Sequence, residues 1–149
     1  MINKKSNTLS LLGKSCEDLH VMSAYLQDSI VAIKDMVFLK KNRTFIMIVN
    51  RFMWEDVEKG LFRHNKRIRC ALHFEEVINV KSKNINQKKN NHSLECLTIK
   101  SRLLFKGIYE TNFFFSGGSI ITILSESLEV VMKDIGKPWK VKYVPLHKI

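Results

Sequence analysis

Hydrophobic and polar residues alternate with a period of two along much of this chain, a pattern typical of strands with one buried face. The longest alternation covers residues 67–80, where Glu76 interrupts the apolar face. We therefore expect either a β-bulge at Glu75–Glu76 or an open sheet edge near Glu76. Similar patterns and β-branched runs predict further strands over residues 30–33, 36–39, 44–52, 94–105, 108–115 and 119–124.

Short polar segments between these strands predict tight turns. Asn42 lies in the polar segment 40–43 and is suited to a positive φ, so it favours a β-hairpin there. Gly117 and Gly118 supply the same backbone freedom after residues 108–115. Residues 53–66 lose the periodicity and are predicted to form a loop.

Helical spacing of apolar residues occurs only near the two ends. Residues 16–27 follow Ser15, a suitable N-cap, and carry acidic residues in their first turn, so they predict an amphipathic helix. A second helix is predicted after Ser125, ending before Gly136 and Pro138. Its apolar residues are Leu128, Val131, Met132 and Ile135.

This order of elements contains no alternation of strand, helix and strand, so a parallel sheet is not expected. We predict an α+β protein. Its core is a strongly bent antiparallel sheet or a two-layer β-sandwich of about six or seven strands, with one helix near each end. A pleckstrin-homology-like half-barrel has a similar plan, as an analogy of element order only.

The composition is that of an ordinary globular protein, with 45% hydrophobic and 26% charged residues in a chain of 149. This length favours a single domain over residues 1–149. No apolar run approaches the ~20 residues that cross a bilayer, and the first residues resemble no secretory signal. The three cysteines fit no disulfide framework. We therefore expect a soluble cytoplasmic protein that binds no membrane.

The net charge of +11 comes from three parts of the chain. Residues 1–14, 81–93 and 137–149 hold eleven lysines and no acidic residue, whereas the rest is balanced. We predict a basic N-terminal arm (1–14), a polar loop (81–93) and a basic tail (137–149). Lysine-rich segments attract the phosphates of nucleic acids. However, Lys greatly outnumbers Arg and is accompanied by many Asn residues, which favours compositional drift over a nucleic-acid site.

Catalytic motifs are absent from the sequence: it has no nucleophile elbow, no phosphate-binding loop and no dinucleotide-binding fingerprint. The five histidines lack the spacing of metal ligands, and no pair of cysteines lies near them. We therefore expect no catalytic residue, no metal and no cofactor, and we interpret the cysteines as buried structural thiols.

One group of polar residues is a candidate ligand site. Asn50, Arg51 and Trp54 lie where a predicted strand ends, and Arg67 and Arg69 share one face of the next strand. Arginine suits an anion, and an indole ring suits a flat or apolar surface. The alternative is structural, with Arg51 paired to Glu55 or Asp56 and Trp54 covering the open end of the sheet.

A series of short motifs resembles a family of small alphaproteobacterial proteins known as a domain of unknown function, number 2948 of that series. The resemblance implies a bacterial cytoplasmic protein with one such domain, and it implies no reaction, ligand or catalytic residue. This chain departs from the family in its Lys and Asn content and in its longer 81–93 segment. The motifs are Glu17-Asp18-Leu19, Ser23-Ala24, Leu26-Gln27-Asp28, Asp35-Met36, Asn50-Arg51-Phe52-x-Trp54-Glu55, Arg67-x-Arg69-x-Ala71-Leu72, Gly117-Gly118, Gly136-x-Pro138-Trp139 and Pro145-x-His147.

Three functions are compatible with these observations. The first is a small non-catalytic binding or interaction module that contacts another protein through a sheet edge or the 50–55 segment. The second is a binder of, or an enzyme for, a small anionic ligand around Arg51 and Trp54. The third is non-specific nucleic-acid binding through the lysine-rich ends. We favour the first, and the sequence predicts no oligomeric state.

Overall fold

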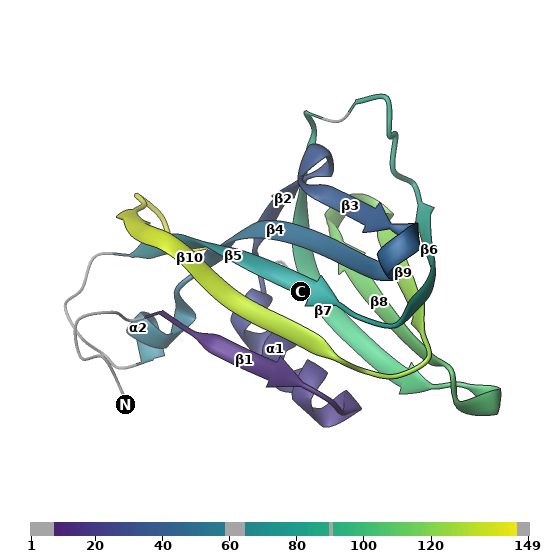
Figure 1. Cartoon of the computed structure of the whole chain (residues 1–149). Coiled ribbons are helices and arrows are strands. Elements are labelled where there is room, and N and C mark those ends of the chain that lie inside the picture. Colours follow the sequence, from purple (N-terminus) through teal and green to yellow (C-terminus); the bar gives the residue numbers. More distant parts are fainter. Residues whose placement is uncertain (1–7, 59–64, 90, 146–149) are drawn as a thin grey trace.

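The computed structural model describes residues 8–58, 65–89 and 91–145, which form an open sheet of ten strands and two α-helices (Figure 1). Each strand pairs with its neighbours in antiparallel fashion, in the order β1-β10-β5-β4-β2-β7-β8-β9-β6, with β3 also paired to β4. The strands are β1 (Ser10–Gly13), β2 (Ile30–Ala32), β3 (Met36–Leu39), β4 (Thr44–Phe52), β5 (Lys66–Phe74), β6 (Val77–Lys83), β7 (Ser93–Leu103), β8 (Tyr109–Phe115), β9 (Ile120–Ser125) and β10 (Val130–Lys140).

The sheet turns back on itself at the short strand β2. Ile30 of this strand pairs with Asn50 of β4 on one side and with Glu95 of β7 on the other. The half containing β7, β8 and β9 therefore lies behind the half containing β4, β5 and β10 (Figure 1). The rings of Phe74 in β5 and Phe113 in β8 have centroids 5.7 Å apart, so the inner faces of both halves share one core.

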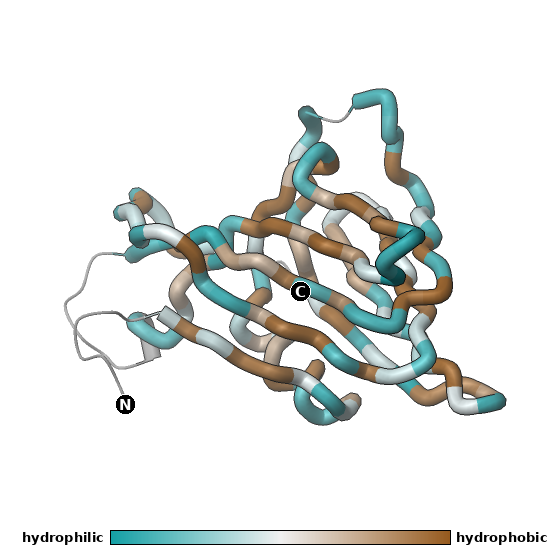
Figure 2. Tube along the Cα trace, viewed as in Figure 1, coloured by the Kyte–Doolittle hydropathy of each residue, from teal (hydrophilic) through white to brown (hydrophobic). Residues whose placement is uncertain are grey.

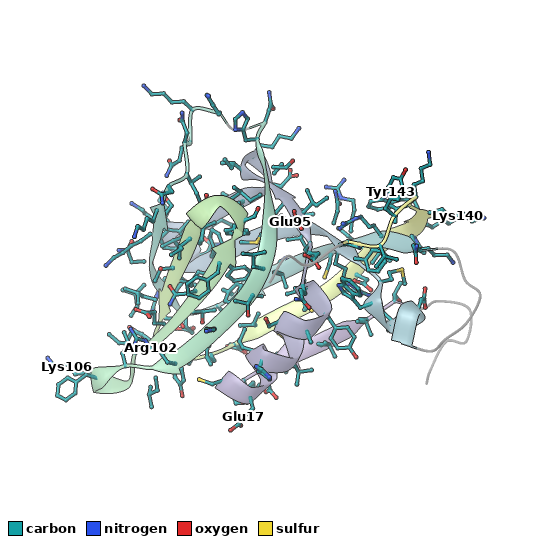
Figure 3. All side chains as sticks on the ribbon, turned by 180° about the vertical axis from the view of Figure 1, so that it is seen from behind. Glu17, Glu95, Arg102, Lys106, Lys140 and Tyr143 are labelled. Atoms are coloured by element: carbon teal, nitrogen blue, oxygen red, sulfur yellow. The ribbon has the colours of Figure 1, made fainter. Side chains whose placement is uncertain are left out.

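The first helix, α1 (Cys16–Leu26), packs on the inner side of the sheet between its two halves (Figure 3). Its buried residues Leu19, Met22 and Leu26 join the core. Ser15 caps the helix, because its hydroxyl accepts a hydrogen bond from the N–H of Asp18 at 3.1 Å. The helix predicted over residues 16–27 is thus confirmed. Within the described residues, no helix combines the length and the apolar character needed to cross a bilayer.

The alternation of hydropathy that predicted a strand from residue 67 onward is visible along β5 (Figure 2). In β5 the inward residues Ile68, Cys70 and Leu72 are almost completely buried. The predicted hairpin at Gly117 and Gly118 is confirmed, and both glycines have positive φ. The chain is therefore α+β with an antiparallel sheet, as predicted, although ten strands exceed the expected six or seven.

The helix predicted near the C-terminus is wrong, because that segment forms the strand β10. Val130, Met132 and Asp134 point inward and are buried, whereas Val131 and Lys133 point outward. In a strand the spacing i, i+3, i+4 and i+7 divides the apolar residues between two faces, so that Met132 is buried and Val131 is exposed. The strand forms because β10 gains hydrogen bonds from both β1 and β5. Gly136 does not end a helix. It has positive φ where the β10–β5 register shifts.

The predicted strand over residues 67–80 is two strands. Glu76 adopts a φ of 54°, and the chain turns there from β5 in one half of the sheet to β6 in the other. The predicted loop over 53–66 contains a short helix, α2 (Trp54–Glu58), and residues 59–64 lie outside the described part. In the first hairpin, Arg43 rather than Asn42 has the positive φ.

Three further boundaries differ from the predictions. The polar loop is shorter than residues 81–93, because β6 extends to Lys83 and β7 begins at Ser93. The predicted basic arm 1–14 includes β1, and the predicted tail 137–149 includes the end of β10. In β7, a register shift after Cys96 leaves Leu97 exposed, whereas Ile99 is buried.

Replacing the N-cap tests the start of α1. Ser15→Ala removes the acceptor for the N–H of Asp18, so the free energy of unfolding should fall by about 1 kcal/mol. Ser10→Ala, in the exposed part of β1, is the matched control and should change it by less than about 0.5 kcal/mol. Urea denaturation followed by circular dichroism measures both, and equal stability of the two variants would contradict the capping role.

Candidate functional site

Arg51 occupies an inward position near the end of β4, and its side chain is completely buried. Its Nε donates to Asp134 Oδ1 at 2.8 Å, and its Nη2 donates to Asp134 Oδ2 at 2.7 Å. Nη1 donates to Glu55 Oε1 of α2 at 3.0 Å. The guanidinium thus forms a two-bond pair with one carboxylate and a further bond with another, the strongest arrangement for a charged hydrogen bond.

The charge of Arg51 is maintained by these carboxylates. Burial opposes the charged form, but the hydrogen bonds to Asp134 and Glu55 outweigh it and raise the pKa of Arg51 above its ordinary value. The guanidinium carbon also lies 6.0 Å from the centroid of the Tyr25 ring. Arg51 therefore stays protonated inside the protein, where its charge is neutralised by its own partners.

Asp134 extends this network to the N-terminal side of β1. Its Oδ2 accepts a hydrogen bond from the N–H of Leu9 at 2.8 Å, and its own N–H donates to the carbonyl of Leu9 at 2.9 Å. The carboxylate thus receives three hydrogen bonds, two from Arg51 and one from the backbone. Arg51 and Asp134 together connect β4, β10, α2 and the segment that enters β1.

Trp54 and Arg67 also make internal contacts. Trp54 Nε1 donates to the carbonyl of Gln27 at 2.8 Å, and its ring meets Phe52 edge-on at 4.6 Å. Arg67 Nη1 donates to the carbonyls of Asp28 and Asn50, both at 3.0 Å. Burial lowers the pKa of Arg67, while the charges of Asp28 and Glu95 act in the opposite direction. These bonds fix the chain where α1 ends and β4 meets β5.

The five candidate residues lie at one end of the β4–β5 pair, but on different faces. Arg51 pairs with Ile68 and points into the core, whereas Asn50 pairs with the exposed Arg69 on the outer face. An external anion would reach Arg51 only by displacing Asp134 or Glu55. The prediction that all five residues bind one ligand therefore stays a prediction, and the geometry separates Arg51 from the outer arginines.

A pocket of about 360 Å³ lies elsewhere, between β3 and β6. The N–H of Val77, at the start of β6, donates to the carbonyl of Arg43 at 2.8 Å, in the turn between β3 and β4. Among the described residues, β3 itself pairs with β4 and not with β6. Eight of the ten lining residues are apolar, and the buried side chains of Phe45 and Ile121 are among them. This pocket is therefore a consequence of the open sheet.

Sequence reasoning did not find this pocket, because its lining comes from distant segments. Met36 and Phe38 belong to β3, Val80 to β6, and Ile85 to the loop that follows. Ile85 was the one available signal, since it is an isolated apolar residue in a polar stretch. Its packing against the core explains why it is there.

The buried pair predicts a large loss of stability when one partner is removed. Asp134→Ala leaves the charge of Arg51 buried with Glu55 alone, so the free energy of unfolding should fall by about 3–5 kcal/mol. Glu110→Ala is the control. It breaks the Arg102–Glu110 ion pair, in which the Arg102 side chain is 70% exposed, and should lower stability by less than about 1 kcal/mol. Similar urea midpoints for both variants would contradict the stabilising role of the buried Arg51–Asp134 pair.

No metal-binding group of three His, Cys, Asp or Glu side chains occurs among residues 8–58, 65–89 and 91–145. Comparison with curated proteins found no similar sequence, and comparison with solved structures found no similar fold. Residues 9–147 match the family described as "Protein of unknown function (DUF2948)", which confirms the resemblance seen in the sequence motifs. Because that match covers nearly the whole chain, the protein belongs to the DUF2948 family.

Proposed function

We propose that this protein is a non-catalytic binding module whose ligand site is the pocket between β3 and β6. The observation that carries the proposal is a largely apolar pocket at a place where the sheet is left open. Its volume of about 360 Å³ falls within the range of small-molecule sites, about 300–1,000 Å³. The occupant is a small molecule rather than a helix or a folded partner.

The lining of the pocket indicates the chemistry of the ligand. Apolar side chains from β3, β4, β6 and β9 supply most of the surface, so the main part of the ligand is apolar. Ser82 and Gln87 are the two polar lining residues, and Gln87 Nε2 lies 3.5 Å from Ser82 Oγ. These groups suit one polar end of the ligand, which they would orient by hydrogen bonds.

The buried thiols support a non-catalytic role. Burial raises the pKa of Cys70 to about 12, and it raises the pKa of Cys96 to about 12 as well. A thiol is a nucleophile only as the thiolate, so neither side chain is activated near neutral pH. Cys16, Cys70 and Cys96 form no disulfide, which supports a reducing compartment such as the bacterial cytoplasm as part of this proposal.

Binding of the neutral dye N-phenyl-1-naphthylamine tests the pocket. The dye should bind the wild-type protein with an increase in fluorescence, because its rings leave water for an apolar cavity. Val80→Arg places a charged side chain in the pocket lining and should weaken binding at least tenfold. Fluorescence titration measures both affinities, and circular dichroism verifies that the variant is folded.

Val21→Arg is the matched control, since Val21 is an exposed residue of α1 that does not line the pocket. It should leave dye affinity within about twofold of the wild-type value. The proposal fails if the wild-type protein does not bind the dye. It also fails if folded Val80→Arg binds as tightly as Val21→Arg.

A further inference from the structure

The outer face of the β5–β10 pair carries a row of cationic side chains. Arg69 on β5 and Lys133 on β10 are exposed there. Of the arginines singled out in the sequence, Arg69 thus belongs to a larger positive surface. Arg51 is buried, and Arg67 is half-buried with its Nη1 bonded to backbone carbonyls.

Exposed cations continue to the end of the sheet and beyond it. Trp139 pairs with Arg67, and Lys140 pairs with Lys66, the first residue of β5. The N–H of Val141 donates to the carbonyl of Asn65 at 2.8 Å, so the two segments stay side by side beyond β10. We name this surface the basic track. Its exposed members are Arg69, Lys133, Lys137, Trp139, Lys140, Lys142 and Tyr143.

Two aromatic side chains are exposed on the basic track. The exposed fraction is 39% for Trp139 and 74% for Tyr143. Lys140 and Tyr143 lie at the same end of the molecule, whereas Arg102 and Lys106 lie at the opposite end (Figure 3). Lys142 Nζ lies 5.7 Å from the centroid of the Tyr143 ring. The exposed surface of both rings is accessible to a flat partner that stacks on it.

The strands and the tail of this surface contain few acidic residues, although the charges of Asp28 and Glu95 reach Arg67, which lies opposite Trp139. Neither β5 nor residues 135–145 contain one, and the only acidic residue of β10 is the buried Asp134. The charge of Asp134 is directed inward, onto Arg51. By contrast, Lys81 in the polar segment acts on Glu110, and Arg102 pairs with Glu110. The lysines of the tail therefore lie near other cations, whereas Lys81 of the polar segment lies near the acidic Glu110.

We propose that the basic track binds single-stranded nucleic acid. Lysine and arginine side chains would contact phosphates, and Trp139 and Tyr143 would stack on unpaired bases. Base faces are accessible in single strands and hidden in a duplex, so the exposed rings favour single strands. Lysines lack the planar fork that reads bases, so binding should be independent of sequence. This site is separate from the pocket between β3 and β6.

Fluorescence anisotropy with labelled 20-nucleotide poly(U) and poly(dT) tests this proposal, and the two probes distinguish RNA from DNA. The full chain should bind at least one of them, with an affinity that falls between 50 and 200 mM KCl. Tyr143→Ala should weaken binding at least fivefold, through the loss of one stacked base. Trp139→Ala should do the same, provided that circular dichroism shows it to be folded.

Two triple variants that remove the same net charge distinguish a specific role of the basic track from a general effect of net charge. The first combines Lys137→Gln, Lys140→Gln and Lys142→Gln. It should weaken binding at least tenfold and make the slope of log K against log [KCl] shallower by about 2. The second triple variant combines Lys41→Gln, Lys100→Gln and Lys106→Gln, which remove the same charge from exposed positions outside the track. It should change the affinity less than twofold.

Several outcomes would overturn the proposal. The wild-type protein could fail to bind both probes at 50 mM KCl, or the two triple variants could weaken binding equally. Unchanged affinity of Tyr143→Ala would remove the stacking role. Equal binding to a 20-base-pair duplex, or to vesicles containing phosphatidylserine, would show a general attraction to anions instead. Dye binding in the pocket should be unaffected by any track variant, so the two proposals fail independently.

Discussion

The packing of β4, β10 and α2 against one another depends on the buried contact between Arg51 and Asp134. Removing a guanidinium and a carboxylate from water is costly, and only close, well-aligned hydrogen bonds offset that cost. Here Asp134 receives two bonds from Arg51 and one from the Leu9 backbone, and Glu55 receives another from Arg51. The pair thereby holds β4, β10, α2 and the approach to β1 in one place.

This internal role of Arg51 determines which surfaces remain for function. Asp134 is the sole acidic residue of β5 and β10, and its charge is used inside. The outer face of the same strands therefore carries Arg69 and Lys133 without an ion-pair partner among the described residues. At the other side of the sheet, β3 and β6 are not paired with each other in the part of the chain that the structure describes, and a pocket lies between them. One end of the fold thus offers a charged surface, and the other an apolar one.

Local patterns predicted the parts of the fold that local interactions decide, such as α1 with its Ser15 cap and the hairpin at Gly117. They failed where distant partners decide. Residues 130–140 fit a helix until pairing with β1 and β5 is known, and Glu76 marks a turn between sheet halves rather than a bulge. For the site, the sequence identified Arg51 and offered Glu55 as a partner, and the structure has that pair. It did not identify Asp134, which is 83 residues away. The residues that line the pocket are also far apart in the sequence, so no local pattern predicts them.

A double-mutant cycle between Arg51 and Asp134 tests the central claim most directly. Urea unfolding would be measured for Arg51→Met, Asp134→Leu, the double variant and the wild-type protein. If the two side chains form one buried unit, each single variant leaves a charge without its main partner, and the double variant recovers part of the loss. The predicted coupling energy is about 2–3 kcal/mol. Additive effects, within about 0.5 kcal/mol, would contradict the dependence of the fold on this pair.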